Sequence, residues 1–252
     1  MLLKVSMKNK KVAVVSGGSK GLGEALCNLL LEKGWYVYVI SRTPINNKIA
    51  QRENHAQIIF DFTSEQSIQS VCDVISHSKI DLLINNAGIA YTEAYDDTSI
   101  TNDFEKVFQT NFMSALKLTL ALKKKLTGGT VITISSDLAY IPVQGLSLYA
   151  SSKSALNAWF ASYAQSETAT KFITVVPSMI DTPMLKALLG KAYGQFKDSM
   201  MNPRKLAHEI LDIGCDTSIG TGTEIFVSHP KMAHTPDEIL TKKLFRELES
   251  EI

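Results

Sequence analysis

Residues 11–23 of this 252-residue chain read KVAVVSGGSKGLG, and this stretch decides the fold class. Its first part, 11–16, is a short run rich in β-branched residues, which is typical of a strand buried on both faces. A glycine-rich turn follows. Apolar residues at helical spacing then run through 22–30, and Gly34 is the expected end of the helix. A strand, a glycine turn and a helix in this order predict the first unit of an α/β fold.

The rest of the chain alternates strand-like and helix-like segments in the same way. Such alternation predicts right-handed βαβ units. We therefore expect an α/β fold, a Rossmann-like doubly wound parallel sheet of about seven strands with helices on both faces. After 11–16, the predicted strands are 35–40, 56–60, 80–84, 130–135, 172–176 and 224–227. The later predicted helices are 68–75, 103–125, 148–167, 184–196, 203–213 and 236–248, with Thr63 and Gln66 spaced as a capping box before the first of them.

The composition is that of an ordinary globular protein, with 45% hydrophobic residues and a net charge of +1. This balance predicts neither a nucleic-acid nor a membrane partner, and the basic run 123–125 is interpreted as a solvated helix end. Cys27, Cys72 and Cys215 lie far apart, which argues against a disulfide framework and against a metal site. The apolar stretch after Met1 is too short for a signal peptide, and no run would span a bilayer, so we expect a cytoplasmic protein.

The glycine turn carries the first functional prediction. A helix N-terminus exposes free N–H groups and a positive dipole end, which stabilise a pyrophosphate, and glycines let the backbone approach it closely. The spacing G-x-x-x-G-x-G differs from the common G-x-G-x-x-G, but its place between a strand and a helix predicts a dinucleotide site. The expected contacts are Gly17, Ser19, Lys20, Gly21, Leu22 and Gly23.

The end of the second predicted strand indicates which dinucleotide binds. Sites for NAD usually place an Asp or Glu there to accept hydrogen bonds from the ribose hydroxyls. Here the strand ends in Ile40-Ser41-Arg42, without an acid, and Lys20 lies in the glycine turn. Two cations and no carboxylate favour a 2′-phosphate, and therefore NADP(H). The alternative is that Arg42 is a solvated loop residue.

Tyr149 and Lys153 are candidates for acid–base chemistry. They lie four residues apart at the start of a predicted helix, so they share one face of it. A free tyrosine has a pKa of about 10 and is a poor catalyst near neutrality. A neighbouring ammonium favours the phenolate and is expected to lower that pKa. The Y-x-x-x-K pair alone says little and depends on the motifs around it.

Those motifs are SGGSKGLG, NNAG, an Asn in the following helix, ISS at the end of the fifth strand, YxxxK and PSMIDTP. The order of these motifs resembles that of the short, single-domain branch of the short-chain dehydrogenase/reductase family. The resemblance is good over residues 11–184 and loose over the rest of the chain. The resemblance implies an oxidoreductase that reduces a ketone, aldehyde or diketone to an alcohol, or catalyses the reverse. It also implies a homodimer or homotetramer built on the helices 103–125 and 148–167.

The resemblance also implies residue roles. Tyr149 would protonate the carbonyl oxygen, and Lys153 would lower the Tyr149 pKa and bind the nicotinamide ribose. Ser136, preferred to Ser135, would hydrogen-bond the substrate oxygen, and Asn111 would hold a proton-relay water. The implied contacts to the rest of the cofactor are Asp61, Phe62, Asn86, Ala87, Gly88, Ile180 and Thr182.

Plainer structural roles stay open for some of these residues. Asn111 would then only brace the sheet, Ser135 and Ser136 would bond locally at a strand end, and Thr182 would only cap a helix. The aromatic residues Trp159, Phe160 and Tyr163 are expected in the core or a subunit interface rather than against substrate.

We expect residues 1–252 to form a single dinucleotide-binding and catalytic domain, with a substrate loop at about 182–201 and a charged tail at about 228–252. The chain departs from the family in carrying Ser16 for Thr and Ser178 for Gly, and in lacking a glycine pair after the last strand. The apolar residues of the substrate loop form either a mobile lid or ordinary core. They are Met184, Leu185, Leu188, Leu189, Met200 and Met201.

Two other functions compete with a reductase. A non-catalytic nucleotide-sensing protein could use the same fold, although loss of Tyr149 or Lys153 would have favoured it and both are present. An epimerase or dehydratase of the longer branch of the family fits less well, because of the glycine spacing and the short C-terminal region.

Overall fold

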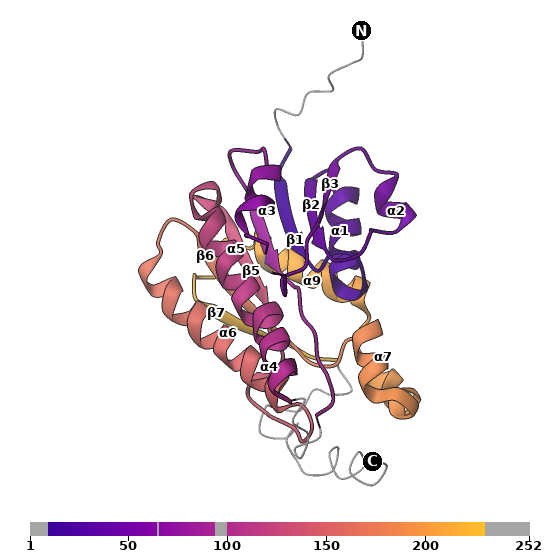
Figure 1. Cartoon of the computed structure of the whole chain (residues 1–252). Helices are drawn as coiled ribbons and strands as arrows, with labels where there is room; N and C mark the ends of the chain where they lie inside the picture. The colour runs from indigo at the N-terminus through magenta and orange to yellow at the C-terminus, as the bar shows by residue number, and fades with distance from the viewer. Residues whose placement is uncertain (1–9, 65, 94–99, 230–252) are drawn as a thin grey trace.

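The computed structural model of the chain describes residues 10–64, 66–93 and 100–229. Its strands are β1 (Val12–Ser16), β2 (Tyr36–Ser41), β3 (His55–Ile59), β4 (Leu82–Asn85), β5 (Thr130–Ile134), β6 (Lys171–Pro177) and β7 (Thr223–Val227). All pair in parallel, in the order β3-β2-β1-β4-β5-β6-β7, which confirms the predicted doubly wound sheet. In Figure 1, β2 and β3 lie on one side of β1, and β5, β6 and β7 lie on the other. The strand order reverses between β1 and β4, and ligands of such sheets bind at the carboxyl ends of the strands beside this point.

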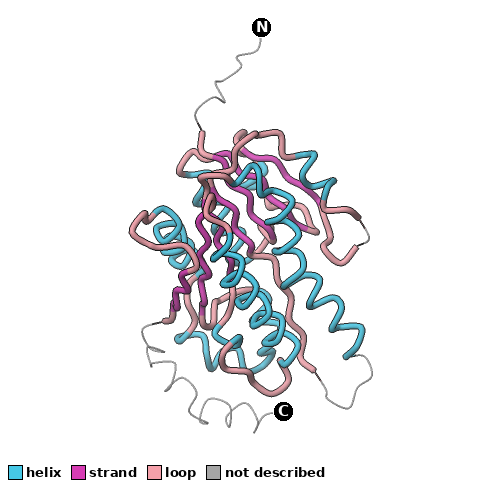
Figure 2. The backbone as a smooth tube through the Cα atoms, turned by 90° about the vertical axis from the view of Figure 1, so that its left-hand side faces the viewer, coloured by secondary structure: helices cyan, strands magenta, loops and turns pink. Residues whose placement is uncertain are grey.

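Helices lie on both sides of the sheet (Figure 2). One face is covered by α1 (Gly21–Glu32), α2 (Asn47–Ala50) and α9 (Pro203–Cys215), and the other by α3 (Gln69–Val74), α5 (Ser114–Leu122) and α6 (Ser147–Ser166). Helix α4 (Ile100–Phe108) packs beside α6, while α7 (Pro183–Leu189) and α8 (Tyr193–Phe196) follow β6. No helix in the described part of the chain is both long and apolar enough to cross a membrane.

The core follows from the two-residue period of the strands. In β1, Ala13 and Val15 join the cluster under α1 and α9, whereas Val12 and Val14 join the cluster under α5 and α6. All four are buried, and each fully buried valine contributes about 1.5–3 kcal/mol. Both faces of the sheet are therefore apolar, which is why the strands read as continuous Val and Ile runs.

Some predicted helices are wrong in detail. The helix expected over 103–125 is interrupted, because a π-helical segment, Gln109–Met113, separates α4 from α5 and a 3₁₀ turn, Lys123–Leu126, follows. The helix expected over 184–196 ends at Leu189, where Gly190 takes a positive φ of 51°. The helix predicted over 236–248 lies outside the described residues.

The predicted capping box is also wrong. The Thr63 amide and hydroxyl both donate to Asp61 Oδ1, at 2.9 and 2.8 Å, and α3 begins only at Gln69. Thr63 therefore belongs to a local turn with Asp61 that precedes the helix, and it does not cap α3. The lysine run also differs from a purely solvated helix end, since Lys125 donates to the Ile75 carbonyl and Lys123 pairs with Glu167 at 2.7 Å.

Candidate active site

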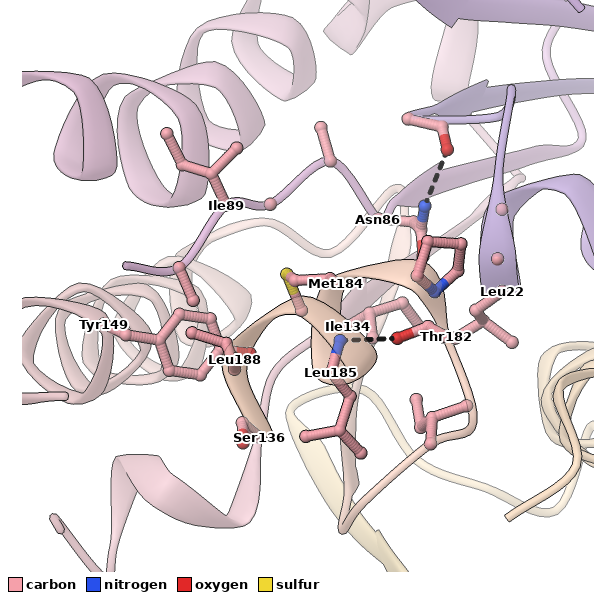
Figure 3. Close-up of a pocket in the computed structure, with 18 of the residues that line it drawn as sticks. Leu22, Asn86, Ile89, Ile134, Ser136, Tyr149, Thr182, Met184, Leu185 and Leu188 are labelled. Atoms are coloured by element: carbon pink, nitrogen blue, oxygen red, sulfur yellow. Dashed lines mark hydrogen bonds between the residues drawn. The ribbon is translucent and has the colours of Figure 1, made fainter. Parts of the chain in front are cut away.

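A cavity of about 560 Å³ opens at the carboxyl ends of the strands (Figure 3). The loops after β1, β2, β3, β4, β5 and β6 contribute to its wall, together with the first turn of α6 and with α7. The structure brings nearly all of the predicted site residues to this one wall. Those that line it are Gly17, Ser19, Lys20, Gly21, Leu22, Gly23, Arg42, Asp61, Phe62, Asn86, Ala87, Gly88, Ser136, Tyr149, Lys153, Ile180 and Thr182.

The glycine turn forms a tight cradle at one end of the cavity. Gly17 has a φ of 69°, and a Cβ there would lie 2.9 Å from Ala87 Cα. A Cβ on Gly23 would lie only 2.2 Å from the Gly17 carbonyl oxygen. The Lys20 side chain does not cap α1, so it leaves the first N–H groups of the helix to a ligand. These features fit a pyrophosphate, which needs close backbone approach and a helix N-terminus.

Ser16 and Asn86 join the ends of β1 and β4 behind this cradle. Ser16 Oγ accepts hydrogen bonds from the Asn86 and Ala87 amides at 3.0 and 3.1 Å. In return, Asn86 Nδ2 donates to the Ser16 carbonyl at 3.0 Å and to the Gly17 carbonyl at 3.3 Å. This network uses only the hydroxyl of Ser16. Serine in place of the family's threonine therefore keeps the group that accepts the two amide hydrogen bonds. Asn86 holds the turn through its side chain.

Arg42 and Asp61 line the cavity together with Lys20, which lies in the glycine turn. Both cations are exposed, and neither forms an ion pair within the described residues. Thr43, which no sequence motif indicated, lines the same wall and shares a 3.0 Å hydrogen bond with Ser19. Asp61 uses one carboxylate oxygen to hold Thr63. The predicted cations are therefore free to meet an anion here.

Tyr149 and Ser136 meet at the opposite end of the cavity. Tyr149 is presented by the first turn of α6 and Ser136 by the end of β5 (Figure 3). Both are buried. Burial raises the pKa of Tyr149 to about 12, and a hydrogen bond with Ser136 opposes this rise. The tyrosine is therefore a protonated donor at neutral pH, next to a second hydroxyl.

Lys153 lies on the same face of α6 as Tyr149, as its spacing predicts. Its ammonium donates to the Ile134 carbonyl at 2.8 Å and lies 5.8 Å from the centre of the Tyr149 ring. Burial lowers the pKa of Lys153 to about 8. Burial is the largest influence on the pKa of both groups, and the expected lowering of the Tyr149 pKa by the Lys153 ammonium stays a prediction.

Asn111 does not line the cavity, and its contacts match the plainer alternative. Its Oδ1 accepts from the Ile89 amide at 2.8 Å, and its Nδ2 donates to the Ile89 carbonyl at 2.9 Å and to Ser152 Oγ at 3.0 Å. The π-helical segment carries it to this loop after β4. A Cβ on Gly88 would lie 3.6 Å from Asn111 Oδ1 and 3.8 Å from Lys153 Nζ, so the two side chains are neighbours across Gly88. The role of Asn111 in a water relay stays a prediction.

The apolar residues after β6 lie partly at the cavity and partly in the core, and the mobility of a lid stays a prediction. Met184, Leu185, Leu188 and Leu189 line the cavity, whereas Met200 and Met201 are buried in the core. Thr182 lines the cavity and accepts a hydrogen bond from the Leu185 amide at 3.3 Å as the cap of α7 (Figure 3). The capping role is therefore observed, while its contact with the cofactor stays a prediction. The aromatic residues Trp159, Phe160 and Tyr163 lie outside the cavity, as expected.

Glu93 is a positioning residue that no local motif indicated. Its carboxylate accepts from the amides of Ser147 and Leu148 at 3.1 and 2.7 Å, and from the Ser147 hydroxyl. It thus caps the first turn of α6, the turn that carries Tyr149. An acid at a helix N-terminus satisfies free N–H groups and complements the helix dipole.

We expect Glu93→Ala to lower the free energy of unfolding by about 0.5–2 kcal/mol, because it removes this cap. Urea denaturation followed by circular dichroism would measure the change. The matched control is Glu209→Ala, on the exposed face of α9, which should change stability by less than about 0.5 kcal/mol. Equal stability of the Glu93 variant and the native protein would contradict the capping role.

Comparisons with known proteins agree with this geometry. A family profile described as short chain dehydrogenase matches residues 11–192. An uncharacterized oxidoreductase of Saccharomyces cerevisiae is 31% identical over 183 residues, covering 69% of this chain and 72% of that protein. A benzil reductase of the same yeast, described as (S)-benzoin forming, is 28% identical over 194 residues, covering 70% and 74%. A short chain dehydrogenase family protein from Francisella tularensis superposes with a TM-score of 0.79 at 25% identity, covering 90% of this chain and 100% of that structure.

The matched profile spans the glycine turn, the end of β4 and the Tyr149–Lys153 pair, which are the parts of the chain that build the cavity. This chain belongs to the short-chain dehydrogenase/reductase family of oxidoreductases.

Proposed function

We propose that this chain is an NADP(H)-dependent reductase of a ketone, aldehyde or diketone, or catalyses the reverse oxidation of the alcohol. One observation carries the proposal: Tyr149, Ser136 and Lys153 share a cavity with an anion-binding glycine turn. A similar protein, the benzil reductase of Saccharomyces cerevisiae, is named for the reduction of a diketone. When bound, the nicotinamide cofactor supplies the hydride that the substrate carbon receives.

The chain's own residues supply the proton and the orientation. The Tyr149 hydroxyl donates its proton to the carbonyl oxygen, and Ser136 Oγ donates a second hydrogen bond to the same atom. The Lys153 ammonium stabilises the phenolate that proton transfer leaves behind. The wall formed by Met184 and Leu188 excludes water and contacts the apolar part of the substrate.

We expect kcat/KM for reduction to fall as pH rises through about 8. Burial lowers the Lys153 pKa to about 8, so the ammonium loses its proton there, while Tyr149, with a pKa of about 12, keeps its own. Above this pH the developing phenolate therefore loses its neighbouring cation. Initial rates between pH 6 and pH 10, roughly two units on each side of this pKa, would measure the profile. A rate that stays constant across pH 8 would contradict the role of Lys153.

Arg42 and Lys20 should favour NADPH over NADH, because a 2′-phosphate gains charge-assisted hydrogen bonds that a hydroxyl does not. Fluorescence titration should give tighter binding of NADPH, and Arg42→Ala should reduce this preference by about 10-fold. Arg52→Ala serves as the control, since Arg52 is exposed and lies outside this cavity. Equal affinities of the native protein for the two cofactors would overturn the assignment to NADP(H).

The proposed reaction is tested by a panel of ketones, aldehydes and diketones, with NADPH consumption followed by absorbance. Turnover of at least one of them, dependent on Tyr149, is expected. NADPH binding without turnover of any carbonyl compound would instead favour a nucleotide-binding role.

We also propose that the chain forms a homodimer or homotetramer through α4, α5 and α6. Phe104 stacks on Phe108 along α4, and Leu120 is exposed on α5. A second copy would cover this apolar surface. Light scattering in solution would test the assembly, and a monomer at micromolar concentration would refute it.

A further inference from the structure

Asp137 places a carboxyl group in the apolar end of the cavity. It follows Ser136 directly after β5 and begins a short 3₁₀ turn. It lines the cavity together with the apolar residues Ile141, Met184 and Leu188. The reaction proposed above uses no carboxyl group, so this residue is left without a role.

The Asp137 carboxyl has few partners of its own. Ser136 Oγ donates to its Oδ1 at 3.1 Å, and no ion pair reaches it from the described residues. The Lys153 ammonium is turned to the Ile134 carbonyl instead. Burial raises the pKa of Asp137 because its charged form loses water, and hydrogen bonds from Ser136 and from backbone amides lower it only in part.

A carboxylate can accept about four hydrogen bonds, so Asp137 keeps spare acceptor capacity at the cavity wall. A carboxylate that has lost more hydrogen bonds to water than it has gained from the protein costs free energy, which a ligand with a donor recovers. An acid in an apolar wall therefore selects a substrate that carries a donor and disfavours one that lacks it.

We propose that Asp137 is a specificity-determining residue that binds a hydrogen-bond donor, a hydroxyl or an ammonium, on the carbon next to the substrate carbonyl. The inference rests on the proposed function, which places the carbonyl oxygen between Ser136 and Tyr149. Because Asp137 lies one hydrogen bond from Ser136, the substituent on the adjacent carbon is the part of the substrate within its reach. The preferred class is an α-hydroxy or α-amino ketone with an apolar remainder.

Binding of the donor also changes the partner of Ser136. In the structure, the Ser136 hydroxyl donates its hydrogen bond to Asp137. A donor on the substrate takes over Asp137, and the Ser136 proton then turns to the carbonyl oxygen. The preference should therefore appear in kcat as well as in KM.

The test compares α-hydroxyacetophenone with α-methoxyacetophenone, using NADPH consumption. Both carry an electron-withdrawing oxygen, but only the hydroxy compound has a donor. The native enzyme should prefer the hydroxy ketone in kcat/KM by about 10–100-fold. In Asp137→Ala, the kcat/KM values for the two ketones should be nearly equal. Asp137→Asn, which keeps an acceptor oxygen but no charge, should retain most of the hydroxyl preference and lose any preference for α-aminoacetophenone. Asp216→Asn, an exposed acid outside the cavity, should leave both ratios unchanged.

Equal turnover of the hydroxy and methoxy ketones by the native enzyme would overturn the proposal and leave the proposed function standing. A preference that persists in Asp137→Ala would also overturn it. If no ketone consumes NADPH, the proposed function fails, and calorimetry with NADP⁺ and the corresponding alcohols still decides the role of Asp137. Tighter binding of 1-phenyl-1,2-ethanediol than of its methoxy ether supports the proposal, and equal binding overturns it.

Discussion

Replacement of Tyr149 by Phe is expected to lower kcat/KM for carbonyl reduction by about 10²–10⁴-fold, the usual contribution of a positioned general acid. The change removes only the hydroxyl. The ring remains in its buried place at the start of α6, and the glycine turn at the other end of the cavity is untouched. NADPH affinity should therefore stay close to that of the native enzyme. Steady-state kinetics and a fluorescence titration on the same preparation measure the two effects separately.

Tyr163→Phe is the matched control for this experiment, because Tyr163 lies on the same helix but outside the cavity. It should leave both kcat/KM and NADPH affinity unchanged. Retained turnover in Tyr149→Phe would show that another group protonates the carbonyl oxygen. Loss of NADPH binding together with turnover would instead indicate a structural role for the hydroxyl.

The second large effect is expected at Gly23. In Gly23→Ala the new Cβ would lie 2.2 Å from the Gly17 carbonyl oxygen, so two parts of the glycine turn proposed to bind the pyrophosphate would have to separate. Overpacking of this kind costs about 1–3 kcal/mol or more, and the displaced amides would no longer face the pyrophosphate. NADPH affinity should fall by at least about 10-fold, since each 1.4 kcal/mol is tenfold in a dissociation constant.

Gly194→Ala controls for the general effect of adding a methyl group at a glycine. A Cβ on Gly194 meets nothing within 4 Å, and the residue does not line the cavity. Its NADPH affinity and thermal midpoint should match those of the native protein. Native affinity in Gly23→Ala would contradict the close packing of the turn, and circular dichroism of both variants distinguishes lost binding from lost folding.

The sheet and the glycine turn could be predicted because their signals are local. Continuous Val and Ile runs indicate strands buried on both faces, and the turn directly joins β1 to α1. The place of Arg42 at the end of a strand is a local signal of the same kind. The residues at the carboxyl ends of parallel strands converge, so most of the predicted residues line one cavity.

Other features depend on partners far away along the chain. Glu93 caps α6 from a position 54 residues earlier, and no spacing rule connects the two segments. The π-helical segment at Asn111 and the turn that replaces the Thr63 capping box are set by tertiary contacts and by a local competitor, Asp61. The raised Tyr149 pKa depends on burial, which sequence spacing does not measure.

The proposed cavity directs hydride transfer to a carbonyl carbon while Tyr149 gives the proton. Reduction of an accepted ketone with NADPH carrying deuterium on one face of nicotinamide C4 tests it most directly, with mass spectrometry and NMR of the alcohol. We expect deuterium on the carbinol carbon from one face only, with no transfer by Tyr149→Phe above background. An alcohol free of deuterium from either face would contradict direct transfer and the function proposed for this cavity.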